Sequence, residues 1–111
     1  MGNIRIPDAV RKPDAETAEP QLQRPPMYRV FMLNDDFTPM DFVVELLVTY
    51  FQKSHEQATE IMLTIHYRGR GLCGIYPFEI AESKVACVER ASRQAGHPLR
   101  CVIEKSDSDE S

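Results

Sequence analysis

Most of the prolines of this 111-residue chain lie apart from its aromatic residues. The first 26 residues contain five of the eight prolines and none of the phenylalanines and tyrosines. Such a segment buries too little apolar surface to offset the entropy lost when its backbone is ordered. We therefore expect residues 1–26 to be a flexible N-terminal extension and residues 27–105 to form one folded domain. The last six residues, Ser106–Ser111, carry acids and no base, which predicts a disordered acidic tail.

The charge and cysteine content exclude several classes of protein. The net charge is -4, and residues 27–105 are nearly neutral, without the basic surface of a nucleic-acid-binding domain. No apolar run is typical of a membrane span or a secretion signal, so we expect a cytoplasmic protein. We also expect this protein to be a monomer. Cys73, Cys87 and Cys101 are an odd set without metal-ligand spacing. We interpret them as reduced packing residues and expect no cofactor or bound metal.

The first half of the domain predicts a strand followed by two helices. Tyr28–Leu33 is rich in β-forming residues and is followed by the turn-forming Asn34-Asp35-Asp36. A helix is then expected, with Thr38 as its N-cap and Pro39 at its first position. Its apolar residues recur with helical period from Phe42 to Phe51. A second helix is expected from Ser54, whose spacing to Gln57 is that of a capping box, up to Gly69 and Gly71.

The second half predicts a short strand, a third helix and a last strand. Leu72–Tyr76 is the short strand, and Gly74 within it indicates a bulge or a close approach of another group. The helix begins near Pro77 and ends near Gly96, and Leu99–Glu104 completes the sheet. The order is β-α-α-β-α-β. We expect an α+β fold with a three-stranded, mainly antiparallel sheet covered by three helices.

The turn Asn34-Asp35-Asp36 and the side chain of His66 are the candidate functional groups. Turn chemistry alone accounts for Asp36 and Thr38, but it does not require both Asn34 and Asp35. His66 follows Ile65 and lies at the edge of the apolar stripe of the second helix. One interpretation of this residue is a half-buried histidine with a single hydrogen bond. The other is a functional group that faces the turn.

Two chemistries are compatible with these groups. Asp35, Asp36 and His66 could serve a small metal-dependent hydrolase, although neither a nucleophile nor further metal ligands accompany them. Alternatively, Asn34, Asp35 and His66 offer three acceptors to an ammonium group, which has three donors. The two expected helices add four apolar side chains nearby: Met40, Val43, Met62 and Ile65. This second arrangement would suit the free amino terminus of a peptide with a bulky first side chain.

Longer motifs show a resemblance to a known family. Residues 34–40 read NDDFTPM, residues 62–71 read MLTIHYRGRG and residues 73–76 read CGIY. Further matches are EIAESKV at 79–85 and HPL at 97–99. Together they resemble ClpS, the adaptor that carries N-degron substrates to the ClpAP protease, over about residues 24–105. A third possibility, a general protein-docking scaffold, is open beside this one.

The resemblance implies a function and a role for each matching residue. The protein would recognise N-terminal Leu, Phe, Tyr or Trp and would not be an enzyme. Asn34, Asp35 and His66 would hold the α-amino group, and Met40 would exclude β-branched side chains. Glu79 and Lys84 would dock on the amino-terminal domain of the ClpA unfoldase, and the N-terminal extension would help to hand the substrate over. The implied side-chain pocket consists of Asp36, Thr38, Met40, Val43, Met62, Ile65 and Leu99.

Overall fold

The computed structural model describes residues 25–106, so the expected extension and acidic tail lie almost wholly outside the described residues. The element order is β-α-α-β-α-β, as predicted. No helix within residues 25–106 is long and apolar enough to cross a membrane. The elements are β1 (Met27–Leu33), α1 (Met40–Phe51), α2 (His55–Arg68), β2 (Arg70–Pro77), α3 (Phe78–Gln94) and β3 (Cys101–Lys105).

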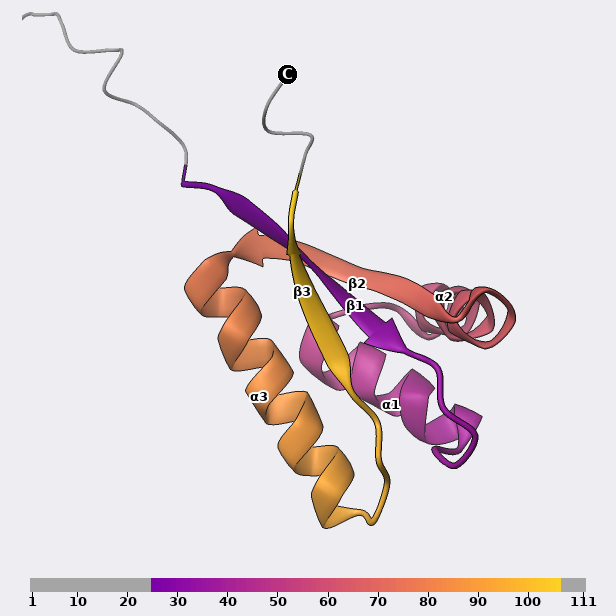
Figure 1. The fold of residues 1–111 in the computed structure, drawn as a ribbon. Helices are drawn as coiled ribbons and strands as arrows, with labels where there is room; N and C mark the ends of the chain where they lie inside the picture. The colour runs from indigo at the N-terminus through magenta and orange to yellow at the C-terminus, as the bar shows by residue number, and fades with distance from the viewer. Residues whose placement is uncertain (1–24, 107–111) are drawn as a thin grey trace, which may run out of the picture.

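The three strands form one antiparallel sheet in the order β2-β1-β3, which confirms the predicted fold class (Figure 1). Val30 pairs with Gly74 and Phe31 with Leu72, so Cys73 is the extra residue of a bulge in β2. A Cβ atom on Gly74 would overlap the phenol ring of Tyr76. Gly74 thus leaves room for the ring of Tyr76, which is the close approach that its position in the sequence indicated, and the bulge itself is formed at the adjacent Cys73.

Helix α3 packs against all three strands, and α1 packs beside α3 (Figure 1). Helix α2 contacts α1 and β2 at the end of the sheet where β1 finishes and β2 begins. The core between these layers is apolar, and Ser92 is the buried polar residue within α3. It consists of Val30, Met32, Val43, Val44, Leu46, Leu47, Phe51, Ala58, Ile65, Cys73, Ala81, Val88, Leu99 and Cys101.

The ends of the helices follow the sequence, with one exception. Ser54 and Gln57 form the predicted capping box, with reciprocal hydrogen bonds of 3.0 and 3.1 Å. Gly69 ends α2 with a φ of 96°, a conformation that glycine adopts without a steric penalty. The prediction that Thr38 caps α1 is wrong. Pro39 occupies the N-cap position and α1 begins at Met40, because the hydroxyl of Thr38 is bonded elsewhere.

Two small features refine the predicted boundaries and the cysteine assignment. Ser106, which was expected in the disordered tail, is buried, and its N–H donates to the carbonyl of Met27 at 2.8 Å. The folded domain thus includes this residue. All three cysteines are free, and Cys73 and Cys101 are buried. Burial raises the pKa of the Cys73 thiol to about 12 and also raises that of Cys101, in keeping with reduced packing residues.

Candidate functional site

The end of β1 is held between two segments that are distant in sequence. The N–H of Leu33 donates to the carbonyl of Arg100 at 3.0 Å, and the N–H of Asn34 donates to the carbonyl of Gly69 at 2.9 Å. Gly69 lies three residues after His66, at the end of α2. The polar turn after β1 is thereby fixed beside both the last turn of α2 and the segment that leads into β3.

The carboxylate of Asp35 organises the turn. Its Oδ1 accepts hydrogen bonds from the backbone N–H groups of Phe37 and Thr38, each at 2.7 Å. Its Oδ2 accepts a hydrogen bond from the Thr38 hydroxyl at 2.8 Å. Asp35 therefore closes a side-chain turn that orients the start of α1. The sequence had assigned this work to Asp36 and Thr38, and the structure corrects that assignment to Asp35 and Thr38.

These hydrogen bonds also set the charge of Asp35. Burial by itself would raise the pKa of this carboxyl, since burial disfavours the charged form. The three hydrogen bonds from Phe37 and Thr38, with a smaller contribution from His97, outweigh burial and lower the pKa below its usual value. Asp35 is consequently a fixed negative charge at neutral pH.

Three other polar side chains near the turn have unused hydrogen-bonding capacity. Asn34, Asp36 and His66 are exposed, and none of their side chains forms a hydrogen bond within residues 25–106. The ring of His66 makes an edge contact with Tyr67, with 4.9 Å between the ring centroids. His66 is thus not the half-buried, hydrogen-bonded histidine that was one of its two interpretations.

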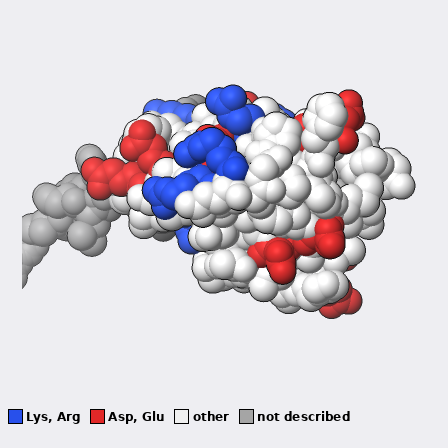
Figure 2. Space-filling model, turned by 90° about the horizontal axis from the view of Figure 1, so that it is seen from below, with Lys and Arg blue, Asp and Glu red and all other residues white. Residues whose placement is uncertain are grey.

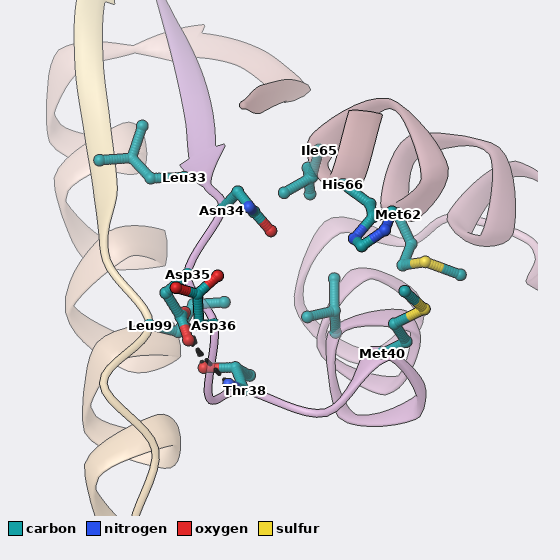
Figure 3. A pocket seen from close by; sticks show the side chains of 11 residues that line it. Leu33, Asn34, Asp35, Asp36, Thr38, Met40, Met62, Ile65, His66 and Leu99 are labelled. Carbon is teal, nitrogen blue, oxygen red and sulfur yellow. Dashed lines mark hydrogen bonds between the residues drawn. The ribbon is translucent and has the colours of Figure 1, made fainter. Parts of the chain in front are cut away.

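The turn and the two helices surround a cavity of about 200 Å³ (Figure 3). Sites for drug-sized ligands usually measure about 300–1,000 Å³, so this one suits a single side chain. It brings together all the residues predicted for amine binding and for the pocket. The lining residues are Leu33, Asn34, Asp35, Asp36, Thr38, Met40, Val43, Met62, Ile65, His66 and Leu99.

Leu33 is the lining residue that the sequence did not reveal. It had been assigned only to the strand, whose last residue it is. The sequence does contain a signal for this role, which is the position of Leu33 directly before Asn34. A side chain at the end of a strand borders the turn that follows. Its N–H bond to Arg100 brings it next to Leu99, and together these leucines form one apolar wall of the cavity.

The apolar part of the cavity is rigid at its base and open at its mouth. Val43, Ile65 and Leu99 are buried, whereas the side chain of Met40 is 45% exposed. A Cβ atom on Gly71 would lie 2.7 Å from Cγ1 of Ile65, so β2 and α2 fit closely behind the cavity. In Figure 3, the thioethers of Met40 and Met62 lie side by side at one edge of the cavity.

Removing the carboxylate of Asp35 is expected to loosen this site and to destabilise the fold. We predict that Asp35→Ala lowers the free energy of unfolding by about 1 kcal/mol, as for the loss of a helix-capping side chain. Because the folded-state pKa is lowered, the stabilisation is present at neutral pH and is lost as pH falls through that value. The two proteins should therefore converge in stability in acid. Urea unfolding at pH 7 and below pH 4 measures this, and equal stability at pH 7 would contradict it.

The two residues predicted for docking have different environments. Glu79 is exposed in the first turn of α3. Lys84 is partly buried, and its Nζ donates to the carbonyl of Tyr50 at 2.7 Å and to the Gln52 side chain at 3.1 Å. The ammonium group therefore satisfies the C-terminal end of α1. The spacing of residues along α3 gives no signal for this role.

The fold and the cavity define a small α+β binding domain with a recess for one side chain below a polar mouth. Comparison with known proteins gives the family. Residues 23–102 match the family model of ClpS, the ATP-dependent Clp protease adaptor protein. The chain belongs to this family, and it is accordingly an adaptor and not an enzyme. The hydrolase alternative is thereby set aside.

Individual relatives agree with this assignment. The chain is 56% identical over 91 residues to the ClpS adapter proteins of Shewanella pealeana and Shewanella piezotolerans, covering 82% of this chain and 89% of each relative. Among solved structures, Agrobacterium tumefaciens ClpS2 bound to L-phenylalaninamide superimposes with a TM-score of 0.72. That protein is 34% identical, and the match covers 75% of this chain and all of the other.

Proposed function

We propose that this protein binds the free amino terminus of proteins that begin with Leu, Phe, Tyr or Trp and delivers them to the ClpAP protease. One observation carries the proposal: a cavity of about 200 Å³ joins an apolar recess to a mouth lined by exposed acceptor groups. An N-terminal residue has the matching parts, which are an ammonium group and, in these four cases, a bulky apolar side chain. The L-phenylalaninamide bound by the Agrobacterium relative has the same two parts.

The α-amino group would be held by Asn34, His66 and the two carboxylates. The Asn34 amide and one His66 ring nitrogen each supply a neutral acceptor. Asp35 contributes a negative charge whose position is fixed by its three hydrogen bonds. Asp36 is exposed and unpaired within the described part of the chain, so its carboxylate is free to accept directly. This extends the expectation from the sequence, in which Asp35 alone provided the carboxylate.

The side chain of the first residue would occupy the recess formed by Val43, Ile65 and Leu99, whose buried surfaces exclude water. Thr38, Met62 and Leu33 complete the wall. Met40 borders the mouth, and its flexible thioether would restrict side chains that branch at Cβ. The recess thus selects for size and shape, while the mouth selects for a free amine.

Peptides that differ only in their first residue test the proposal. Burying a large apolar side chain contributes about 1.5–3 kcal/mol, so peptides beginning with Leu, Phe, Tyr or Trp should bind about ten-fold or more tightly than those beginning with Ser, Val or Asp. Fluorescence anisotropy of labelled peptides measures the affinities. Equal binding of the whole series would contradict the proposal and would favour a general docking scaffold.

Delivery to the protease would use a separate surface that includes Glu79 and Lys84, docked on the amino-terminal domain of ClpA. Glu79 is available for such contacts in α3. The hydrogen bonds of Lys84 to the end of α1 give it a structural role as well. Substitution of Lys84 would consequently affect the docking surface partly through the local structure around Tyr50.

A further inference from the structure

The exposed face of α3 carries opposite charges at its two ends. One stripe of side chains follows the helix with spacings of three and four residues, so its members share a face. All of them are exposed, and the charged ones form no hydrogen bond or ion pair within residues 25–106. This α3 stripe is about 21 Å long, because an α-helix rises about 1.5 Å per residue. It consists of Glu79, Glu82, Ala86, Arg90 and Arg93.

The two arginines at the end of the α3 stripe lack a counter-charge among the described residues. The helix dipole favours bases at this end, which accounts for their position but supplies no partner. Glu89 is bonded to the start of β3 instead, where it accepts hydrogen bonds from the N–H of Cys101 at 2.9 Å and from Arg100 at 3.4 Å. Helix α3 ends at the lower edge of the molecule in Figure 1, and Figure 2 shows Lys and Arg gathered on one side of the face seen from below. This end of the stripe is therefore a basic surface that is open to an acidic segment.

The chain that precedes β1 leaves the domain beside the other, acidic end of the α3 stripe. Pro25 and Pro26 line one pocket with Glu79, in the first turn of α3. Read from Pro25 toward the N-terminus, the sequence has Arg24, four uncharged residues and then three acids with no base between them. These acids are Glu19, Glu16 and Asp14. The order of charges along this segment is basic and then acidic, which complements the acidic and then basic order of the stripe.

The length of the segment matches the length of the stripe. An extended chain advances about 3.3–3.6 Å per residue, so six residues reach about 20 Å. Glu19 is six residues from Pro25 and would thus reach the arginines at the far end of α3. The uncharged residues in between would cross Ala86, whose small side chain leaves room for them. Arg24 would face the two acids at the near end.

We propose that the acidic segment of residues 14–19 docks on the α3 stripe of its own chain, where its carboxylates pair with Arg90 and Arg93. Exposed ion pairs are individually weak, so the contact is partial and depends strongly on salt. The covalent link favours it, because a short tether holds the segment near the helix at a concentration in the millimolar range. The docked segment covers the face of α3 that includes Glu79. The contact must therefore open when the unfoldase docks there, a consequence that rests on the proposed function.

A spin label at residue 17 tests the contact in the full chain. Thr17→Cys in a Cys87→Ser background supplies one accessible thiol, since Cys73 and Cys101 are buried. At low salt the label should broaden the backbone NMR signals in the second half of α3 several-fold more than those of α2. This excess broadening should disappear at about 1 M salt, where the Debye length is about 3 Å.

Charge variants show whether the arginines hold the segment. Arg90→Gln/Arg93→Gln should remove the excess broadening, and Arg90→Glu/Arg93→Glu combined with Glu16→Lys/Glu19→Lys should restore it. Arg68→Gln removes an exposed base of α2 and should leave the broadening unchanged. The inference is overturned if the excess broadening is absent at low salt, or if it is equal in Arg90→Gln/Arg93→Gln and in the unmodified protein.

Two ligands separate this inference from the proposed function. The amino-terminal domain of ClpA should release the segment, and excess broadening that persists in the complex would show that the two do not compete for Glu79. If that domain does not bind, the proposed delivery fails, while the charge variants still decide the contact. L-phenylalaninamide should bind Arg90→Gln/Arg93→Gln as it binds the unmodified protein, because the α3 stripe does not line the cavity.

Discussion

Acetylation of the amino group of a Phe-first peptide is expected to lower its affinity for this protein by a factor of one hundred or more. The acetyl group removes the positive charge and two of the three donors of the ammonium group. Asn34, His66 and the carboxylates at the mouth would then face an amide that cannot satisfy them. A hydrogen bond that involves a charged group contributes about 1.5–3 kcal/mol, and losing two of them accounts for the predicted factor.

The measurement is direct binding of matched acetylated and free peptides by isothermal titration calorimetry or anisotropy. The control is a peptide whose α-amino nitrogen carries one methyl group, because this amine keeps its positive charge. It should lose much less affinity than the acetylated peptide. Equal affinity of the free and acetylated peptides would show that the polar mouth does not recognise the amine.

The sequence was sufficient to predict the fold class, and with the resemblance to ClpS it predicted every residue that lines the cavity except Leu33. The expected helices carried Met40 and Val43 on one and Met62 and Ile65 on the next, and the structure brings these residues together around the cavity. The capping box at Ser54 and the glycine at Gly69 fixed the ends of α2. These signals succeed because they are local, so each of them depends on residues within a few positions of one another.

The features that the sequence missed depend on contacts between distant segments or on a choice between adjacent side chains. Lys84 reaches the end of α1 only after α3 has packed, so its contact with Tyr50 has no local signal. Asp35 and Asp36 are both good turn formers, and sequence alone could not tell which carboxylate would close the turn. The structure resolves this choice through the hydrogen bonds to Asp35. The bond from Leu33 to Arg100 likewise places Leu33 at the cavity only in the folded chain.

The mouth of the cavity combines the fixed negative charge of Asp35 with the exposed acceptor groups of Asn34 and His66. Asp35 is positioned by backbone N–H groups, so its charge requires no reorganisation when a cation arrives. Asn34 and His66 are anchored near the same point because the N–H of Asn34 is bonded to Gly69 of α2. The two sides of the mouth are thus joined by a backbone hydrogen bond rather than by the side chains that meet the ligand.

Replacing the two neutral acceptors together is expected to be the most damaging change to the protein itself. We predict that Asn34→Ala and His66→Ala each weaken binding of a Phe-first peptide by about ten-fold or more, and that the double variant loses at least one hundred-fold. Both side chains are exposed and make no hydrogen bond within residues 25–106, so the fold should be unaffected. Thr64→Ala is the matched control, an exposed position of α2 that does not line the cavity.

The role of His66 can be separated from that of Asn34 by two substitutions that keep or remove its acceptor. An imidazole accepts a hydrogen bond through one ring nitrogen, and a glutamine side chain accepts through its amide oxygen. His66→Phe keeps an aromatic ring but has no acceptor, so it should weaken binding of a Phe-first peptide about ten-fold or more. His66→Gln keeps an acceptor, so it should retain part of the affinity that His66→Phe loses. Equal affinity of His66→Phe and the unmodified protein would mean that His66 does not accept a hydrogen bond from the bound amine, and the site would then rest on Asn34 and the carboxylates.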